Sequence, residues 1–246
     1  MTTVAFRFYG PLNDFLPRLQ RQATLVCAYQ GRMNVKDAIE SLGVPHPEVD
    51  LIVVNGMPVP FDYAVQPRDR VAVYPAFTHI GLPRELRLIP PLVEPRFVAD
   101  AHLGRLAAYL RLLGFDTAYR NDVADEDLAE RSANEDRVLL TRDLGVLKRG
   151  IVRRGYFLRA TNPARQLVEV VRRYDLAPQA RPFSRCLPCN APLAPAPKTH
   201  VAPFVPPRSR DHFEAFSRCP ACGRVYWQGS HYARMRRLVE AALGGG

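Results

Sequence analysis

The stretch "RFVADAHLGRLAAYLRLLGFDTAYRNDVADEDLAERSANEDRVLLTRD", residues 96–143, decides the fold of the larger part of this chain. It alternates short apolar runs, which favour strands, with segments of helical periodicity. In residues 102–114 the leucines recur on one helical face, and Gly114 is typical of a helix end. "YFLRA" and "NPARQLVEVVRRY" continue the alternation further on. Strands that alternate with helices predict a parallel sheet covered by helices on both faces.

An aspartate follows each of two predicted strands, Asp100 in "RFVAD" and Asp143 in "VLLTRD". The carboxyl ends of parallel strands lie along one edge of a sheet, so we expect both to face one cleft. Asp125, which opens the helix "DEDLAE", can join them. Three close carboxylates repel one another unless a divalent cation such as Mg²⁺ or Mn²⁺ neutralises them. Water on that cation can attack a phosphodiester, and Arg142 and Lys148 could hold the nucleic-acid backbone.

An ordinary structural role for these acids has to be weighed beside this one. Asp100, Asp125 and Asp143 each precede a predicted helix, so each could be an N-cap. The two roles are compatible, because a capping carboxylate keeps a second oxygen. The joint pattern of two strand ends, an acidic loop and a basic domain favours the metal site. Nearby Asp122, Glu126 and Asp127 are weaker alternatives.

The charge of the chain is unevenly distributed along its 246 residues. Of the net charge of +10, residues 91–246 supply 25 Lys/Arg against 16 Asp/Glu, whereas residues 1–90 are nearly balanced. A basic surface of this size favours a polyanion, with nucleic acid first, although general solubility is the alternative. There is no apolar run of the roughly 18 residues that a membrane helix needs, and the start does not resemble a signal peptide. We therefore expect a soluble, cytoplasmic protein with no membrane partner.

Four of the five cysteines form two pairs that indicate a metal. Cys186 and Cys189 are separated by 29 residues from Cys219 and Cys222, whereas Cys27 stands alone in an apolar strand. Two such pairs supply four thiolates in a tetrahedral array, which closes the shell of a zinc ion. A closed shell leaves no position for a substrate, so the predicted role of this zinc is structural. The segment between the pairs is a proline-rich and basic insertion.

The segment "RVYWQGSHYARMRR", residues 224–237, mixes aromatic and basic side chains. Such mixtures can stack bases and hold phosphates. The same residues could instead pack between the ribbon and the last helix, which is our preferred interpretation for Trp227. His231 is unneeded as a fifth zinc ligand.

The N-terminal part has the element order of a β-grasp domain. We expect strands at 3–9, 23–29, 49–56 and 69–77 and a helix at 34–43. The stretches "SLGVPHPEVDLIVVNG" and "RDRVAVYP" resemble the ubiquitin-like sulfur-carrier proteins. Those act through a flexible Gly-Gly tail, whereas this domain continues into a proline-rich linker at 81–95, and the terminal "LGGG" follows the last helix of the other domain. A sulfur-carrier or modifier role is therefore disfavoured.

The long quoted block, together with "SRCLPCNAPL" and "CPACGRVYWQGSHYARM", resembles the Mut-seven-C ribonuclease family over nearly all of residues 96–238. The resemblance implies a PIN-like three-layer α/β/α core at 96–180 and a zinc ribbon with a C-terminal helix at 181–246. A ubiquitin-like domain at 1–80 precedes them.

By this resemblance Asp100, Asp125 and Asp143 are the metal-binding acids of a ribonuclease. Many PIN-like enzymes have a fourth acid after the next strand, where this chain has Thr161 and Asn162, so the number of metals stays open. The candidate RNA-binding side chains are Arg142, Lys148, Arg105 and His231.

The expected function is hydrolysis of RNA with catalytic Mg²⁺ or Mn²⁺ and structural Zn²⁺. The alternative is a non-catalytic RNA-binding adaptor, and the ubiquitin-like domain could bind a protein partner.

Overall fold

The computed structural model describes residues 2–76 and 83–244 and divides the chain into two compact units. The first unit consists of residues 1–93 and 125–157, and the second of residues 94–124 and 158–246. Phe77, the first two residues of the predicted linker and the last two glycines lie outside the described residues. Within the described ranges, no helix combines the length and the apolar character that crossing a bilayer requires.

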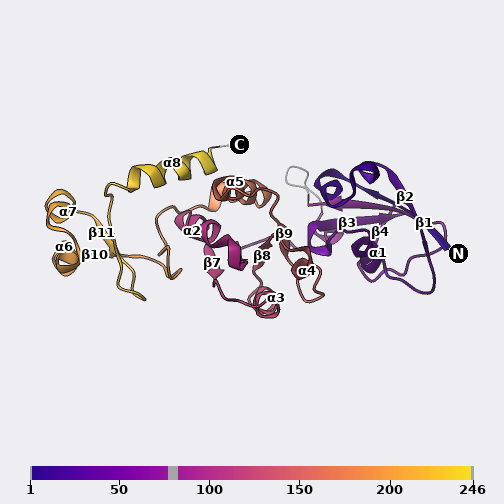
Figure 1. The fold of residues 1–246 in the computed structure, drawn as a ribbon, viewed down its shortest axis with the longest axis horizontal. Helices are drawn as coiled ribbons and strands as arrows, with labels where there is room; N and C mark the ends of the chain where they lie inside the picture. The colour runs from indigo at the N-terminus through magenta and orange to yellow at the C-terminus, as the bar shows by residue number, and fades with distance from the viewer. Residues whose placement is uncertain (1, 77–82, 245–246) are drawn as a thin grey trace. The chain divides into compact units, whose positions relative to one another are not determined.

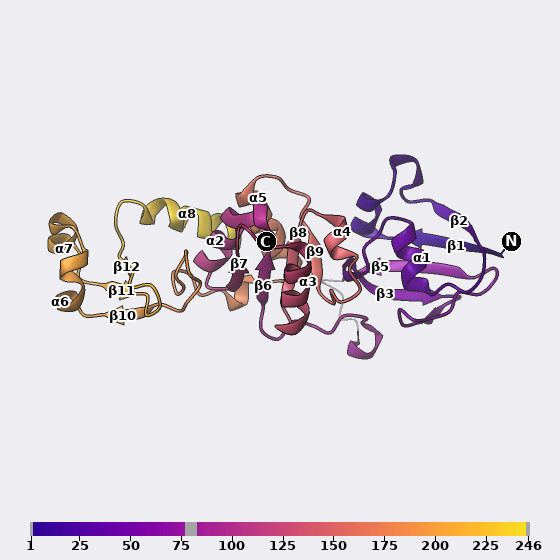
Figure 2. The same ribbon diagram turned by 60° about the horizontal axis from the view of Figure 1, so that its bottom comes forward.

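The N-terminal part of the first unit is a five-stranded mixed sheet in the order β2-β1-β5-β3-β4. Its strands are β1 (Thr2–Phe8), β2 (Thr24–Tyr29), β3 (Val49–Val54), β4 (Met57–Pro58) and β5 (Arg70–Pro75). β1 pairs antiparallel with β2 and parallel with β5, while β3 pairs antiparallel with both β4 and β5. The helix α1 (Val35–Ser41) packs on one face of this sheet (Figure 2). The predicted β-grasp domain is confirmed.

Local sequence signals set the limits of α1. The Asn34 side chain caps its first turn by accepting the N–H of Asp37 at 2.7 Å. Val35, Ala38 and Ile39, spaced along one helical face, are buried in the core between helix and sheet. Just after the helix, Gly43 has a φ of +103°, a backbone conformation that glycine adopts without strain.

The first unit also contains part of the α/β core. Its elements are α3 (Asp125–Asn134), β8 (Val138–Thr141), α4 (Leu144–Leu147) and β9 (Gly155–Phe157). β8 and β9 run parallel, with Leu139 opposite Gly155 and Thr141 opposite Phe157. Every residue of β8 is buried, as expected for a parallel strand with both faces covered.

A short 3-10 turn of the β-grasp domain, His46–Glu48, packs against β9. The Glu48 carboxylate is almost fully buried and accepts the backbone N–H of Phe157 at 2.7 Å. The ring of His46, also buried, donates through Nε2 to the carbonyl of Val152 at 2.8 Å. Since buried polar groups need partners, these contacts attach the β-grasp domain firmly to this part of the α/β core.

The second unit holds the other strand pair and three long helices. These elements are β6 (Arg96–Ala99), α2 (Gly104–Leu112), β7 (Asp116–Tyr119), α5 (Pro163–Arg173) and α8 (Tyr232–Leu243). β6 and β7 are parallel, with Arg96 opposite Asp116. α5 packs against both α2 and α8, and Figure 1 shows α8 running beside α5.

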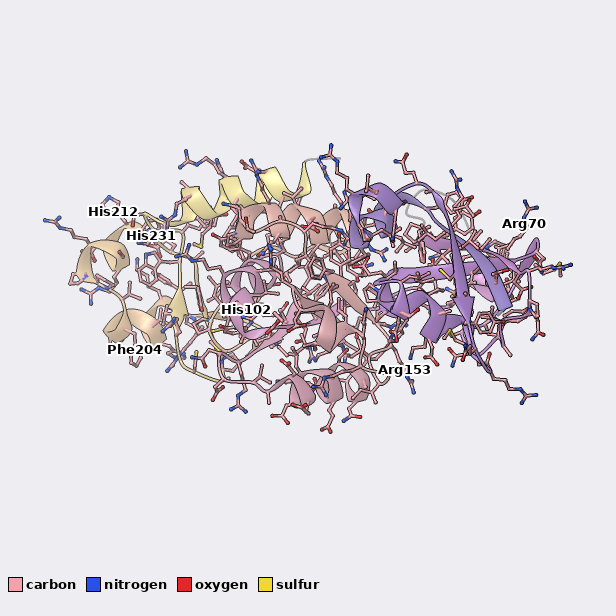
Figure 3. The ribbon with its side chains drawn as sticks, turned by 45° about the vertical axis from the view of Figure 1, so that its right-hand side comes forward. Arg70, His102, Arg153, Phe204, His212 and His231 are labelled. Atoms are coloured by element: carbon pink, nitrogen blue, oxygen red, sulfur yellow. The ribbon has the colours of Figure 1, made fainter. Side chains whose placement is uncertain are left out.

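The cysteine-containing part of the second unit is a small antiparallel sheet, β10 (Ala194–Ala196), β11 (Phe216–Arg218) and β12 (Val225–Tyr226). The insertion between the cysteine pairs is not an irregular loop. It forms β10 and two short helices, α6 (Lys198–Val201) and α7 (Pro207–His212), and Figure 3 marks Phe204 and His212 in this region. The fold class expected from the sequence, parallel α/β with a ribbon and an N-terminal α+β domain, is confirmed.

Candidate functional site

The four paired cysteines come together at one point of the second unit. Their sulfurs all lie within 4.8 Å of one another, the only such group of metal-ligating side chains among residues 2–76 and 83–244. Cys186 and Cys222 are 3.6 Å apart, and Cys189 and Cys219 are 3.3 Å apart. Zn–S bonds of about 2.3 Å in a tetrahedron separate sulfurs by about 3.8 Å. The donor set and its spacing therefore fit a zinc ion.

The two cysteine pairs lie on knuckles of the same design. In the first, the N–H of Asn190 donates to the Cys186 carbonyl at 2.9 Å, and in the second Gly223 donates to Cys219 at the same distance. Asn190 and Gly223 both have left-handed backbones, with φ of +69° and +72°. Asparagine and glycine are the residues that tolerate this conformation best. The residue after each pair thus closes the turn that brings two thiols together.

The thiols influence one another's ionisation. Burial opposes the Cys219 thiolate, but hydrogen bonds from the Cys222 backbone and from Cys189 outweigh it and lower the Cys219 pKa to about 6. At Cys189 the Ala191 backbone favours the thiolate, whereas burial and the neighbouring thiols oppose it and raise the pKa to about 12. Without a cation, the first thiolate forms readily and discourages the second. A divalent cation that accepts all four sulfurs removes this conflict.

The first knuckle is held to the α/β core by a buried arginine. Arg111, in α2, donates through Nε to the Thr117 carbonyl at 2.9 Å and through Nη1 to Leu187 and Pro188 at 2.7 and 2.8 Å. Burial lowers the pKa of Arg111, while the charges of Cys189 and Cys186 oppose that shift. The guanidinium therefore places a positive charge next to a site where thiolates collect.

Asn190 makes a second connection from the knuckle to the start of β7. Its amide oxygen accepts the N–H of Thr117 at 3.0 Å, and its amide nitrogen donates to Asp116 at 2.7 Å. Gly114, with φ of +95°, lies where a Cβ would clash with the Arg181 carbonyl oxygen. The ribbon is therefore part of the core packing of this unit.

The two strand-end aspartates both cap helical turns. Asp100 follows β6, is 5% exposed, and accepts the N–H of Ala101 at 2.5 Å. Its second oxygen lies 3.1 Å from Nε2 of His102, an exposed side chain that is marked in Figure 3. Asp143 follows β8, is exposed, and accepts the N–H of Gly145 at 2.6 Å. Each cap fixes one carboxylate oxygen, as the capping alternative predicts.

The other predicted site residues differ in their surroundings. Asp125 is exposed at the first position of α3, and Arg105 is exposed in the first turn of α2. Arg142 is exposed beside Asp143, and His231 is exposed immediately before α8. Lys148 is half-buried, and its ammonium donates to the Glu40 carbonyl of the β-grasp domain at 2.9 Å.

Comparison with known protein families identifies both parts of the chain. Residues 95–239 match the family model of the Mut7-C RNAse domain, and residues 1–81 match that of the Mut7-C ubiquitin domain. This chain belongs to the Mut7-C family. The resemblance predicted from the sequence is thereby confirmed. No curated protein and no solved structure matched the chain.

Some residues of this Mut7-C protein that hold its parts together were not predicted from the sequence. Arg111 and the pair His46 and Glu48 are charged or titratable side chains with partners far along the chain. The contact of His102 with Asp100 could have been predicted locally, since His102 lies two residues after Asp100 in the same turn. Trp227 packs against Phe216 within the ribbon, whereas the packing against the last helix that was preferred for it stays a prediction.

Proposed function

We propose that this Mut7-C protein is a metal-dependent ribonuclease that hydrolyses RNA phosphodiester bonds. Asp100, Asp125 and Asp143 are the acids proposed to bind Mg²⁺ or Mn²⁺, and the four cysteines hold a structural zinc. The observation that carries the proposal is the match to the Mut7-C RNAse domain, which spans all seven residues. The position of two of these acids directly after parallel strands supports it.

The chain's own residues prepare the carboxylates for this role. A backbone N–H fixes one oxygen of Asp100 and one of Asp143, which limits how far either side chain can turn. The exposed His102 imidazole lies 3.1 Å from the second oxygen of Asp100 and limits its rotation further. A divalent cation bound by these acids would stabilise charge on the scissile phosphate and activate a water molecule.

The proposed RNA contacts come from four basic side chains. Arg142 directly precedes Asp143, and Arg105 and His231 are exposed in the second unit. A lysine ammonium has three N–H donors, so the bond from Lys148 to Glu40 does not exclude a phosphate contact. Phosphate contacts of this kind position RNA without reading its sequence.

Substitution of Asp143 by asparagine tests the proposal, with the same substitution at the other end of β8 as the control. Asp143→Asn keeps the shape of the cap and removes the charge that the cation needs. We expect it to abolish cleavage of a mixed RNA pool with Mn²⁺ or Mg²⁺ while zinc content and secondary structure stay unchanged. Asp136→Asn is the matched control, because Asp136 precedes β8, pairs with Arg154 at 3.0 Å, and has a left-handed φ that asparagine tolerates.

Two results would contradict the proposal. One is unchanged cleavage by a folded Asp143→Asn protein. The other is retention of RNA by the wild-type protein with no cleavage under any divalent metal, which would identify the adaptor alternative.

A further inference from the structure

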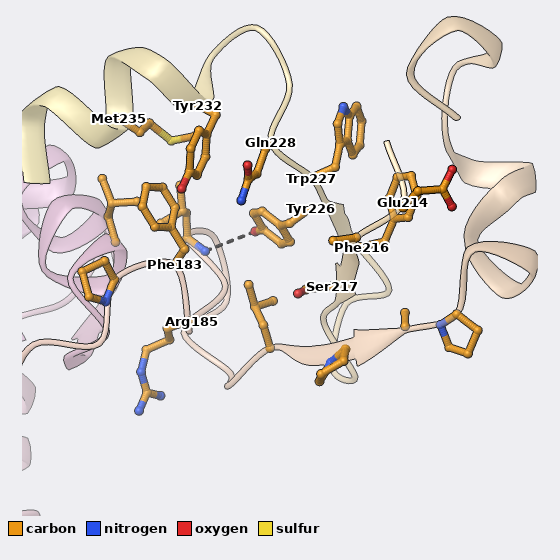
Figure 4. A pocket seen from close by; sticks show the side chains of 18 residues that line it. Phe183, Arg185, Glu214, Phe216, Ser217, Tyr226, Trp227, Gln228, Tyr232 and Met235 are labelled. Atoms are coloured by element: carbon orange, nitrogen blue, oxygen red, sulfur yellow. Dashed lines mark hydrogen bonds between the residues drawn. The ribbon is translucent and has the colours of Figure 1, made fainter. Parts of the chain in front are cut away.

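A cavity of about 880 Å³ lies in the second unit between the ribbon, the start of α8 and the segment before the first knuckle. This volume is within the range of about 300–1,000 Å³ that is typical of ligand sites. Its lining is mostly apolar and is rich in aromatic rings, among them Phe183, Tyr226, Trp227 and Tyr232 (Figure 4). The proposed catalytic acids are not part of this lining.

The cysteine cluster and the ribbon core hold two of these rings in place. The Tyr226 hydroxyl accepts the N–H of Leu187 at 3.2 Å and lies 3.1 Å from the Cys186 sulfur. The indole of Trp227 packs against Phe216, with ring centroids 6.4 Å apart. Both rings therefore have fixed positions without help from a ligand.

The opposite wall is formed by a pair of rings from two segments. Phe183 and Tyr232 lie with centroids 4.7 Å apart and planes inclined by 36°. Figure 4 shows the Gln228 side chain between Tyr232 and Tyr226, at the level of the rings. An aromatic wall with one amide can accept a flat ring that carries hydrogen-bonding edges.

The charge around the cavity selects the class of occupant. Residues 181–244 carry ten Lys/Arg and only three Asp/Glu. The one acid in the lining, Glu214, is paired with Lys198 at 2.5 Å. A neutral apolar peptide would gain nothing from this excess of positive charge, whereas a ligand with flat apolar rings on an anionic backbone uses both features.

We infer that this cavity binds unpaired bases of single-stranded RNA, and that it is a substrate-holding subsite separate from the catalytic acids. The inference rests on the proposed function for its substrate class. In it, the rings of Tyr232 and Trp227 contact the bases, Gln228 meets a base edge, and the arginines of the ribbon and of α8 attract the phosphates.

Trp227 gives a direct readout, because it is the sole tryptophan of the chain. The full-length, zinc-loaded protein is titrated with a short oligoadenylate in buffer without Mg²⁺ or Mn²⁺, and tryptophan emission is followed. We expect saturable quenching, because a base enters the cavity against the indole. Inorganic polyphosphate, which carries charge but no base, should bind without comparable quenching.

Two matched substitutions locate the effect. Tyr232→Leu removes a ring from the cavity and should weaken oligoadenylate binding by ~5- to 150-fold, the range that corresponds to stacking of one base. Phe204→Leu removes a ring that is 60% exposed in the insertion and does not line the cavity, so it should leave the Kd unchanged. Zinc content and circular dichroism establish that each variant is folded.

The inference is overturned if RNA binds without changing Trp227 emission, or if polyphosphate quenches it equally. A change in emission that depends on protein concentration alone would identify a second copy as the occupant and overturn it as well. The wild-type titration decides the matter even if Tyr232→Leu fails to fold. Cleavage is measured separately after Mn²⁺ is added, so quenching without cleavage would refute the nuclease and retain the base site.

Discussion

Replacing Arg111 by methionine tests whether the ribbon and the α/β core depend on each other. In the wild-type protein this buried guanidinium donates to the carbonyls of Thr117, Leu187 and Pro188. Methionine fills a similar volume but donates nothing, so all three carbonyls lose their donor. The positive charge next to the thiolates is lost at the same time.

The size of the effect follows from these contacts. A hydrogen bond from a charged donor contributes about 1.5–3 kcal/mol. The Nη1 group is shared between Leu187 and Pro188, so we count two bonds rather than three. Pro188 is exposed, and water can replace part of what its carbonyl loses. We therefore expect the free energy of unfolding of the zinc-loaded protein to fall by about 2–4 kcal/mol. Because Arg111 supports the first knuckle, zinc affinity should fall about 10- to 100-fold.

The assay combines urea unfolding, followed by circular dichroism, with competition for zinc by a chromophoric chelator. Arg105→Met is the control, because Arg105 lies on the same helix and is exposed. It should change neither quantity. Arg111→Lys should lower both the stability and the zinc affinity, but by less than Arg111→Met. Lysine keeps the positive charge but lacks the planar guanidinium group that reaches several carbonyls. If Arg111→Met bound zinc as tightly as the control and unfolded at the same urea concentration, the proposed coupling would be wrong.

Two further predictions concern the β-grasp domain. Glu48→Ala removes the carboxylate that accepts the Phe157 N–H and should lower the free energy of unfolding by about 1–3 kcal/mol. Glu48→Gln keeps an acceptor oxygen, so its free energy of unfolding should fall by less. Equal decreases for the two variants in urea unfolding would contradict this explanation. Burial opposes the Glu40 carboxylate, but the hydrogen bond and charge of His46 hold its pKa below the ordinary value of 4.5. Folding therefore releases a proton there, so the contribution is present above pH 4.5 and is lost as the pH falls through the folded-state pKa. Glu40→Gln should flatten the dependence of the urea midpoint on pH in the acid range, and unchanged dependence would show that this pair does not contribute.

Features with a local cause could be predicted from the sequence. The helix after Asn34 begins with the expected cap and ends before Gly43, because the signals lie within a few residues of the structure they form. The knuckles were predictable for the same reason, since each cysteine pair is followed by a residue suited to a left-handed backbone. For Asp100 and Asp143 the capping role is seen in the structure, and the catalytic role stays a prediction.

Features that depend on distant partners could not be predicted. Arg111 interrupts a run of leucines, and its charge would assign it to solvent, yet it is buried and its partner Leu187 lies 76 residues further on. Glu48 finds Phe157 109 residues away. The helices of the insertion were missed for another reason: Pro207 occupies the first turn of α7, where no N–H is needed, so proline begins this helix rather than preventing it.

The contact between Glu48 and β9 has a consequence for how the chain can be divided. A strand whose outer N–H groups have no acceptor invites pairing with another molecule, and natural proteins cover such edges. Here the cover is supplied by a different domain, one that the linker separates in sequence. A truncation at that linker would expose the backbone N–H of Phe157 to solvent and leave an uncovered strand edge. The β-grasp domain thus covers this strand edge, and a Mut7-C RNAse domain expressed without it should associate with itself more readily.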